Sequence, residues 1–200
     1  MQTKRRTHKS NQSRPGTVVI VALTFIASAL FVSAPASAQL VAENDMIIAV
    51  RSGDVARVEE QFLAGLSANE RSIRTVPALI EAVTAGSKDV VALLLERGAR
   101  VNTTPIRANQ TALEAAVRTN RMDIAQLLID AGADVDKAGT DNETPLMIAA
   151  KLGHTNMVQL LIDAGAYLND TDNTGRTPLM LAVERRHRST VEVLEAAGAQ

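Results

Sequence analysis

After residue 38, the side chains best suited to chemistry are two histidines, His154 and His187, which stand 33 residues apart. An imidazole can bind a metal ion or transfer a proton. Structural zinc needs four protein ligands and catalytic zinc three, and the chain has no Cys to add to the pair. The simpler interpretation places each His at the start of a helix, so no metal site is predicted.

Acidic residues form the other candidate groups, such as Asp134 with Asp136 and Asp170 with Asp172. Both pairs lie in polar segments between apolar ones, where Asp commonly accepts hydrogen bonds from its own backbone in a turn. The chain contains no G-x-S-x-G, no H-E-x-x-H and no phosphate-binding loop. The sequence therefore predicts a protein that is not an enzyme and that needs no cofactor or metal.

Residues 1–38 differ in composition from the rest of the chain. Five basic residues and no acid precede an apolar run at 17–32, and an Ala-Ser-Ala site follows. This pattern is typical of a secretory signal peptide, cut here between Ala38 and Gln39. The run has 16 residues, fewer than the roughly 20 that span a bilayer. We expect a periplasmic or secreted mature chain; an uncleaved inner-membrane anchor is the alternative.

Composition limits what the mature chain can be. Cleavage would leave 16 Lys and Arg against 22 Asp and Glu, a net charge of −6, which is unlike a nucleic-acid-binding protein. Aromatic residues make up only 2% of the full chain, while hydrophobic residues make up 46%. A core built from aliphatic residues and Ala favours stacked helices over a β-sandwich.

A period of 33 residues organises the chain after residue 40. Three apolar or small positions recur at intervals of 33, 34, 33 and 33 residues, which is the signature of a repeat architecture. The recurring residues are Gly65, Gly98, Gly132, Gly165 and Gly198; Ala49, Ala82, Ala116, Ala149 and Ala182; and Met46, Leu79, Leu113, Leu146 and Leu179.

The clearest repeat spans residues 137–169. Thr144 is suited to cap a helix whose first residue is Pro145, where the missing N–H costs nothing. Gly153 and Gly165 can end two successive helices by adopting a left-handed conformation. Each repeat is therefore predicted to hold two helices and a polar loop.

These residues resemble the ankyrin-repeat family, whose unit is a β-turn with two antiparallel helices. The resemblance rests on Thr144-Pro145-Leu146, Thr177-Pro178-Leu179, the recurring Gly-Ala pairs and Gly153-His154. It implies an all-α solenoid of five helix-turn-helix repeats, joined by β-turn or hairpin loops, that binds another protein as a monomer. The domain would span 39–200, with repeats at about 40–69, 70–102, 103–136, 137–169 and 170–200.

Two departures from the family pattern lead to structural expectations. Met147 and Met180 stand where the family has a His that ties neighbouring turns by hydrogen bonds, so we expect apolar packing to hold these turns together. Arg186 occupies the position between the two helices where other repeats have Gly or Asn. Since Arg adopts a left-handed conformation at some cost, we expect the last inter-helix loop to differ in shape.

The resemblance places a partner on the concave surface formed by the loops and the first helix of each repeat. One column there reads Arg51, Thr84, Arg118, Lys151 and Glu184. Three basic residues in an otherwise acidic chain could attract an acidic partner. Ordinary solvation of an exposed helix face explains the same charges.

The loop tips vary more than the rest of the repeat, as either a recognition surface or unconstrained loops would. The single insertion lies in the loop of 99–112, and insertions in solenoids often map to the binding face. The loop residues that complete the predicted partner surface are Arg74, Ile106, Arg107, Gln110, Asp141, Glu143 and Arg176.

The resulting prediction is an exported, non-catalytic module that holds a partner protein. Its resemblance to short bacterial periplasmic ankyrin proteins implies support of an oxidative-stress enzyme such as catalase. Two alternatives stay open: an inhibitor or immunity protein for a toxic enzyme, and a secreted effector that binds host proteins. No nucleic acid and, after cleavage, no membrane is expected as a partner.

Overall fold

A computed structural model describes residues 44–105, 110–139 and 142–200. The predicted signal peptide and its cleavage site lie outside the described residues, as do Ile106, Arg107 and Asp141. Within those three segments the chain forms ten helices, and its only β-type pairing is a single bridge between Arg71 and Pro77. The helices are α2 (Asp45–Ser52), α3 (Val55–Leu63), α4 (Ala78–Ala85), α5 (Lys88–Glu96), α6 (Ala112–Arg118), α7 (Met122–Asp130), α8 (Pro145–Leu152), α9 (Thr155–Asp163), α10 (Pro178–Glu184) and α11 (Arg188–Ala196).

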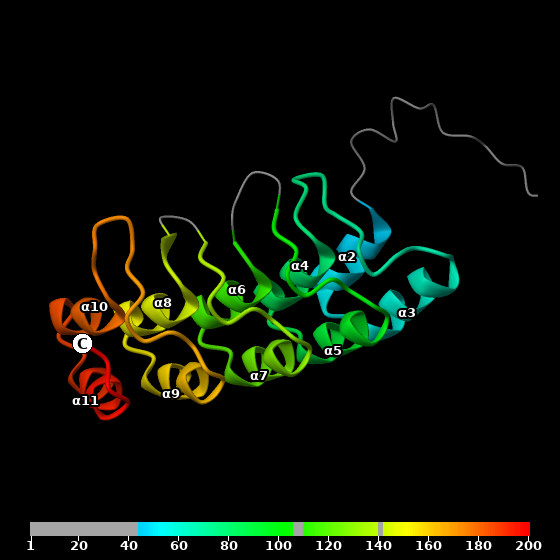
Figure 1. Ribbon diagram of the computed structural model, residues 1–200. Coiled ribbons are helices and arrows are strands. Elements are labelled where there is room, and N and C mark those ends of the chain that lie inside the picture. The colour runs from blue at the N-terminus through cyan, green and yellow to red at the C-terminus, as the bar shows by residue number, and fades with distance from the viewer. Residues whose placement is uncertain (1–43, 106–109, 140–141) are drawn as a thin grey trace, which may run out of the picture.

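The helices lie in two parallel rows (Figure 1). The first row contains α2, α4, α6, α8 and α10, and the second contains α3, α5, α7, α9 and α11. Each helix contacts its partner in the other row and the next helix of its own row. Loops rise from the first row on one side of the molecule. The predicted all-α solenoid of two-helix repeats is confirmed.

Helix α8 forms for the reasons its sequence indicates. Thr144 accepts a hydrogen bond from the backbone N–H of Met147, and Pro145 occupies the first turn. Gly153 ends the helix at φ 72°, and its N–H bonds back to the last turn. The same Thr cap begins α6 at Thr111 and α10 at Thr177.

The core consists of the predicted columns stacked on one another. Leu79, Leu113 and Leu146 are at most 2% exposed, and the Ala column that follows each of them is fully buried. Because each helix pair covers the apolar side of its neighbour, the core is a continuous strip along the solenoid.

The inter-helix loops share one conformation, so the expectation of a different last loop was wrong. Arg186 adopts φ 61° and Asn120 φ 53°, close to the 70–74° of the three glycines at this position. The N–H of His187 donates to the carbonyl of Ala182, just as His154 donates to Ala149, each at 3.0 Å. The two flanking helices impose this geometry on whichever residue lies between them.

Neighbouring loops are tied by hydrogen bonds, which corrects the expectation that apolar packing replaces them. One side chain in each loop accepts from a backbone N–H of the next repeat at 2.8–2.9 Å. The four acceptors are Asn69, Asn102, Asp136 and Asn169, at intervals of 33, 34 and 33 residues. Met147 is fully buried, and its sulfur accepts from the N–H of Thr144 at 3.5 Å. Asparagine and aspartate thus tie successive loops by hydrogen bonds, at repeat positions other than those of Met147 and Met180.

Candidate functional site

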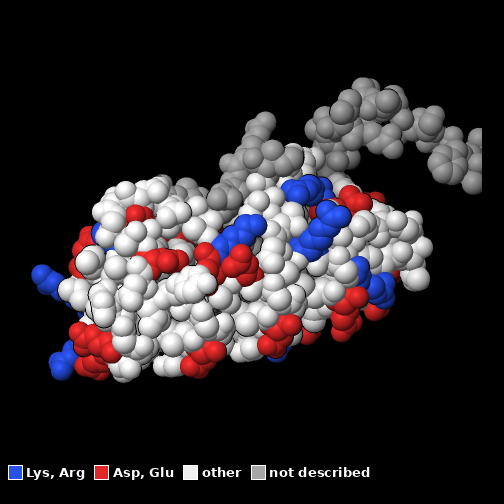
Figure 2. Space-filling model, viewed as in Figure 1, with Lys and Arg blue, Asp and Glu red and all other residues white. Residues whose placement is uncertain are grey.

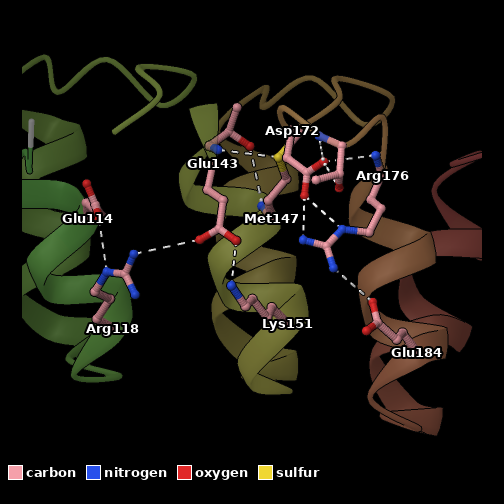
Figure 3. Close-up of polar contacts among 10 residues, drawn as sticks. Glu114, Arg118, Glu143, Met147, Lys151, Asp172, Arg176 and Glu184 are labelled. Carbon is pink, nitrogen blue, oxygen red and sulfur yellow. Dashed lines mark hydrogen bonds and ion pairs between the residues drawn. The ribbon is translucent and has the colours of Figure 1, made fainter. Parts of the chain in front are cut away.

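The closing bond of each loop positions the side chains at its foot. The N–H of residue 72, 139 or 172 donates to the carbonyl four residues later, at 2.9–3.1 Å. This bond fixes Val76, Glu143 and Arg176 at matching places, immediately before the Pro or Thr that precedes the first-row helix. Glu143 and Arg176 therefore reach down beside α8 and α10 (Figure 3).

Charged residues gather where the loops rise from the first row, on a side that we call the inner face. Figure 2 shows both signs of charge along this band, above α4, α6 and α8. The charged residues that define the inner face are Arg51, Glu81, Glu114, Arg118, Glu143, Lys151, Asp172, Arg176 and Glu184.

The basic column predicted from the sequence is paired with acids from neighbouring elements. Arg51 makes two hydrogen bonds to Glu81, at 2.8 and 2.9 Å, and so joins α2 to α4. Glu143 lies between two cations, with its Oε1 2.5 Å from Nζ of Lys151 and its Oε2 3.8 Å from Nη2 of Arg118 (Figure 3). The Arg51–Glu81 and Arg118–Glu143 pairs each link two successive repeats, whereas Lys151–Glu143 lies within one repeat.

Four cations of this network are each more exposed than the acid that lies nearest to them. The side chains of Arg51, Arg118, Lys151 and Arg176 are 31–41% exposed. Their partners Glu81, Glu114, Glu143 and Asp172 are only 2–13% exposed. The fifth acid of the inner face, Glu184, is 51% exposed beside Arg176. Over the rest of the inner face, a protein that approaches meets the positive groups first.

The loop of the last repeat forms a tight network around one carboxylate. Asp172 accepts from the hydroxyl and N–H of Thr174 and from the N–H and guanidinium of Arg176. The Thr174 hydroxyl and these further donors hold the pKa of Asp172 well below its ordinary value. Arg176 also contacts Glu184 at 3.2 Å, and its hydrogen bond to Asp172 raises the pKa of its guanidinium. This loop is therefore fixed in its charged form.

The structure places six of the residues predicted to bind a partner on the inner face, in three separate groups: Arg51; Arg118, Glu143 and Lys151; and Arg176 with Glu184. Arg74 lies apart at an exposed loop tip, and Gln110 is half-buried before α6. Glu81 and Glu114 were not predicted from the sequence, and Asp172 was predicted only to bond its own turn. Glu114 could have been identified because it is acidic at a repeat position where the other repeats have apolar residues.

The histidines and aspartates that could carry chemistry instead make hydrogen bonds to backbone groups. His154 contacts the carbonyl of Val117 at 3.0 Å, and His187 contacts that of Lys151 at 3.1 Å, each in the preceding repeat. Asp172 bonds its own loop as expected, whereas Asp136 accepts from Tyr167 in the next repeat. Among the described residues, no three His, Asp or Glu side chains are arranged to hold a metal ion.

A second concavity lies on the opposite row of helices. An open groove of about 510 Å³ runs between α9 and α11 and is lined by Thr155, Gln159, Ile162 and Val193, among others. In the part of the chain that the structure describes, no helix has the length and apolar character needed to cross a membrane.

The chain is similar to known proteins throughout its helical part. The protein-family model described as ankyrin repeats (3 copies) matches residues 46–138 and 135–200. A palmitoyltransferase of Drosophila melanogaster is 33% identical over 90 residues, which cover 45% of this chain and 14% of that protein. An ankyrin repeat and KH domain-containing protein of Caenorhabditis elegans is 39% identical over 90 residues, covering 44% and 3%.

A bacterial relative covers slightly more of the chain. An ankyrin repeat-containing protein of Treponema pallidum (strain Nichols) is 36% identical over 99 residues, which are 49% of this chain and 33% of that protein. The chain thus spans at most a third of the length of these three relatives.

Proposed function

The chain belongs to the ankyrin-repeat family, and from this premise we propose that it holds an acidic partner protein on its inner face without catalysing a reaction. Ankyrin repeats are protein–protein interaction modules. The observation that carries the proposal is the layering of charge at four of the pairs, with cations 31–41% exposed above carboxylates 2–13% exposed; the fifth acid, Glu184, is 51% exposed. Complementary charge raises association rates and selects partners.

Buried acids also fix the cations in place before a partner arrives. Arg51 is held through two hydrogen bonds and Lys151 through a contact of 2.5 Å. Ordering a long basic side chain on binding costs about 0.5–1.5 kcal/mol. On the inner face much of that cost is met during folding, so the carboxylates of a partner meet donors already aimed at them.

Charge reversal tests this surface directly. We expect R118E/K151E to reduce capture of partner protein from a cell extract at least tenfold, because the variant presents acids to an acidic partner. The variant K88E/R188E is the matched control: it changes the net charge equally, but at exposed positions on second-row helices. Equal capture by both variants would overturn the proposal, provided that circular dichroism shows both are folded.

Residues 1–38 form the second part of the proposal, as a signal that exports the chain. Their basic start, apolar run and Ala-Ser-Ala site support it. Amino-terminal sequencing of the protein from the periplasm or culture medium should begin at Gln39. An intact N-terminus recovered in membranes would instead support an inner-membrane anchor.

We propose an oxidative-stress enzyme, such as a catalase, as the class of partner. Its support is the resemblance to short periplasmic ankyrin proteins and the predicted export. Deletion of the gene should raise sensitivity to peroxide, and R118E/K151E should fail to restore resistance. A captured toxin would support the immunity-protein alternative, and a captured host protein the effector alternative.

A further inference from the structure

Glu114 is a buried acid at a position where the other repeats have apolar side chains. The matching residues are Ile47, Ile80, Met147 and Met180. Glu114 is 2% exposed, at the third position of α6, and lies one turn above Arg118 on the inner face (Figure 3). A buried carboxylate among apolar side chains lowers the stability of the folded state unless both of its oxygens accept hydrogen bonds. The presence of Glu114 here therefore points to a functional role.

One oxygen of this carboxylate lacks a partner. Oε1 accepts from Nε of Arg118 at 2.9 Å. Oε2 is buried and has no hydrogen-bond partner among the described residues. Glu114 therefore keeps an unused acceptor beneath the surface of the inner face, and a side chain of a partner reaches it only by displacing the side chains that cover it.

The unused acceptor is matched best by a positive charge. Arg118 is shared between Glu114 and Glu143, while Glu143 has Lys151 to itself at 2.5 Å. Glu114 is thus the less compensated of the two acids. Donors that carry a charge make the strongest hydrogen bonds to carboxylates, so Lys or Arg fits this place better than a neutral donor.

We infer that Glu114 receives one basic side chain of the partner, set among the acidic side chains that bind Arg51 and Lys151. This inference rests on the proposed function of the inner face and adds a specific pattern to it. First-row helices of successive repeats stack about 10 Å apart, and an extended peptide advances about 3.3 Å per residue. One repeat therefore corresponds to roughly three residues of a peptide laid along the inner face.

That spacing predicts a sequence motif in the peptide that binds. Arg51 lies two repeats before Glu114, and Lys151 lies one repeat after it. The basic residue should then lie about six residues from an acid on one side and about three from an acid on the other. We expect a selection from a random peptide library against the mature protein to enrich this arrangement.

The decisive measurement tests whether Glu114 is responsible for the contribution of the peptide's basic residue to binding. The probe is the most enriched peptide, labelled with fluorescein, together with a copy in which norleucine replaces the Lys or Arg. On the natural protein, the replacement should weaken binding at least tenfold. On E114Q, which keeps the shape of the side chain and removes its charge, it should change binding less than twofold.

Each other outcome has a definite meaning. Enrichment of acidic peptides with no fixed basic residue overturns this inference and leaves the proposed function intact. Enrichment of no acidic peptide overturns both. Equal coupling in E114Q and in the natural protein also overturns the inference. The variant E114M, which copies the neighbouring Met147, checks folding: it should melt no lower than the natural protein and should select acidic peptides without the basic residue.

Discussion

Asp136 differs by one side-chain atom from the asparagines at the matching positions of the other repeats. It is the one acid among the four residues that tie each loop to the next repeat. Asn69 and Asn102 accept with Oδ1 and also donate from Nδ2 to the carbonyls of Gly98 and Gly132, at 3.1 and 3.0 Å. A carboxylate cannot donate, so Asp136 makes only the first of these two bonds.

Replacing this acid with an amide should stabilise the protein. In D136N the new amide can donate to the carbonyl of Gly165, as the two asparagines do at the matching position. One added hydrogen bond contributes about 0.5–1.5 kcal/mol, which is a rise of roughly 1–6 °C in melting temperature for a domain of this size. A thermal melt measures it. The reverse change, N102D, is the control and should lower the melting temperature.

The advantage of D136N should also depend on pH. Burial raises the pKa of Asp136 above its ordinary 3.8, and the charges of Asp170 and Asp134 raise it further, while the N–H of Tyr167 opposes them. The folded state therefore binds this proton more tightly than the unfolded chain does. That contribution to stability is complete below about pH 3.8 and is lost as the pH rises through the folded pKa. The difference in melting temperature between D136N and the natural protein should thus be larger at neutral pH than in acid.

At the scale of elements, the two helices of a repeat fix the conformation of the loop between them, whichever residue that loop contains. Arg186 takes the left-handed backbone that glycine takes in three other repeats. For a residue with a Cβ, that conformation costs about 1 kcal/mol or more of free energy. We expect R186G to raise the melting temperature by a few degrees, measured by thermal denaturation.

The opposite change at a matched glycine is the control. In G153A the new Cβ would collide with the ring of His187, in addition to the strain of φ 72°. The variant should melt clearly below the natural protein. If G153A were neutral or R186G destabilising, the shared conformation of these loops would carry no energetic weight.

The sequence predicts helices well because their signals are local and repeated. Thr144 and Pro145 start α8 as expected, and Gly153 ends it. The ion pairs are harder to predict because they join different repeat positions: Glu143 stands at a loop foot, whereas Arg118 and Lys151 stand near helix ends. A column of aligned residues shows which charges recur but not which side chains reach one another, nor that the acids lie beneath the cations.

At the scale of the molecule, each repeat is covered by the next, and α10 has exposed apolar side chains where the matching residues of α8 are buried. Met180 and Val183 are 52% and 56% exposed, whereas the matching Met147 and Ala150 of the preceding repeat are fully buried. The solenoid thus has distinct surfaces: an open apolar end, a second row with the groove between α9 and α11, and the charged inner face. Among the described residues, the ion pairs that join one repeat to the next lie on the inner face, which is why we assign the partner to it.

The most direct test of this assignment is hydrogen exchange of the protein with and without its captured partner. The account predicts slower exchange in α4, α6 and α8 and at the foot of the loops beside them, with little change in second-row helices. Slower exchange confined to α9 and α11, at the groove between them, would contradict it.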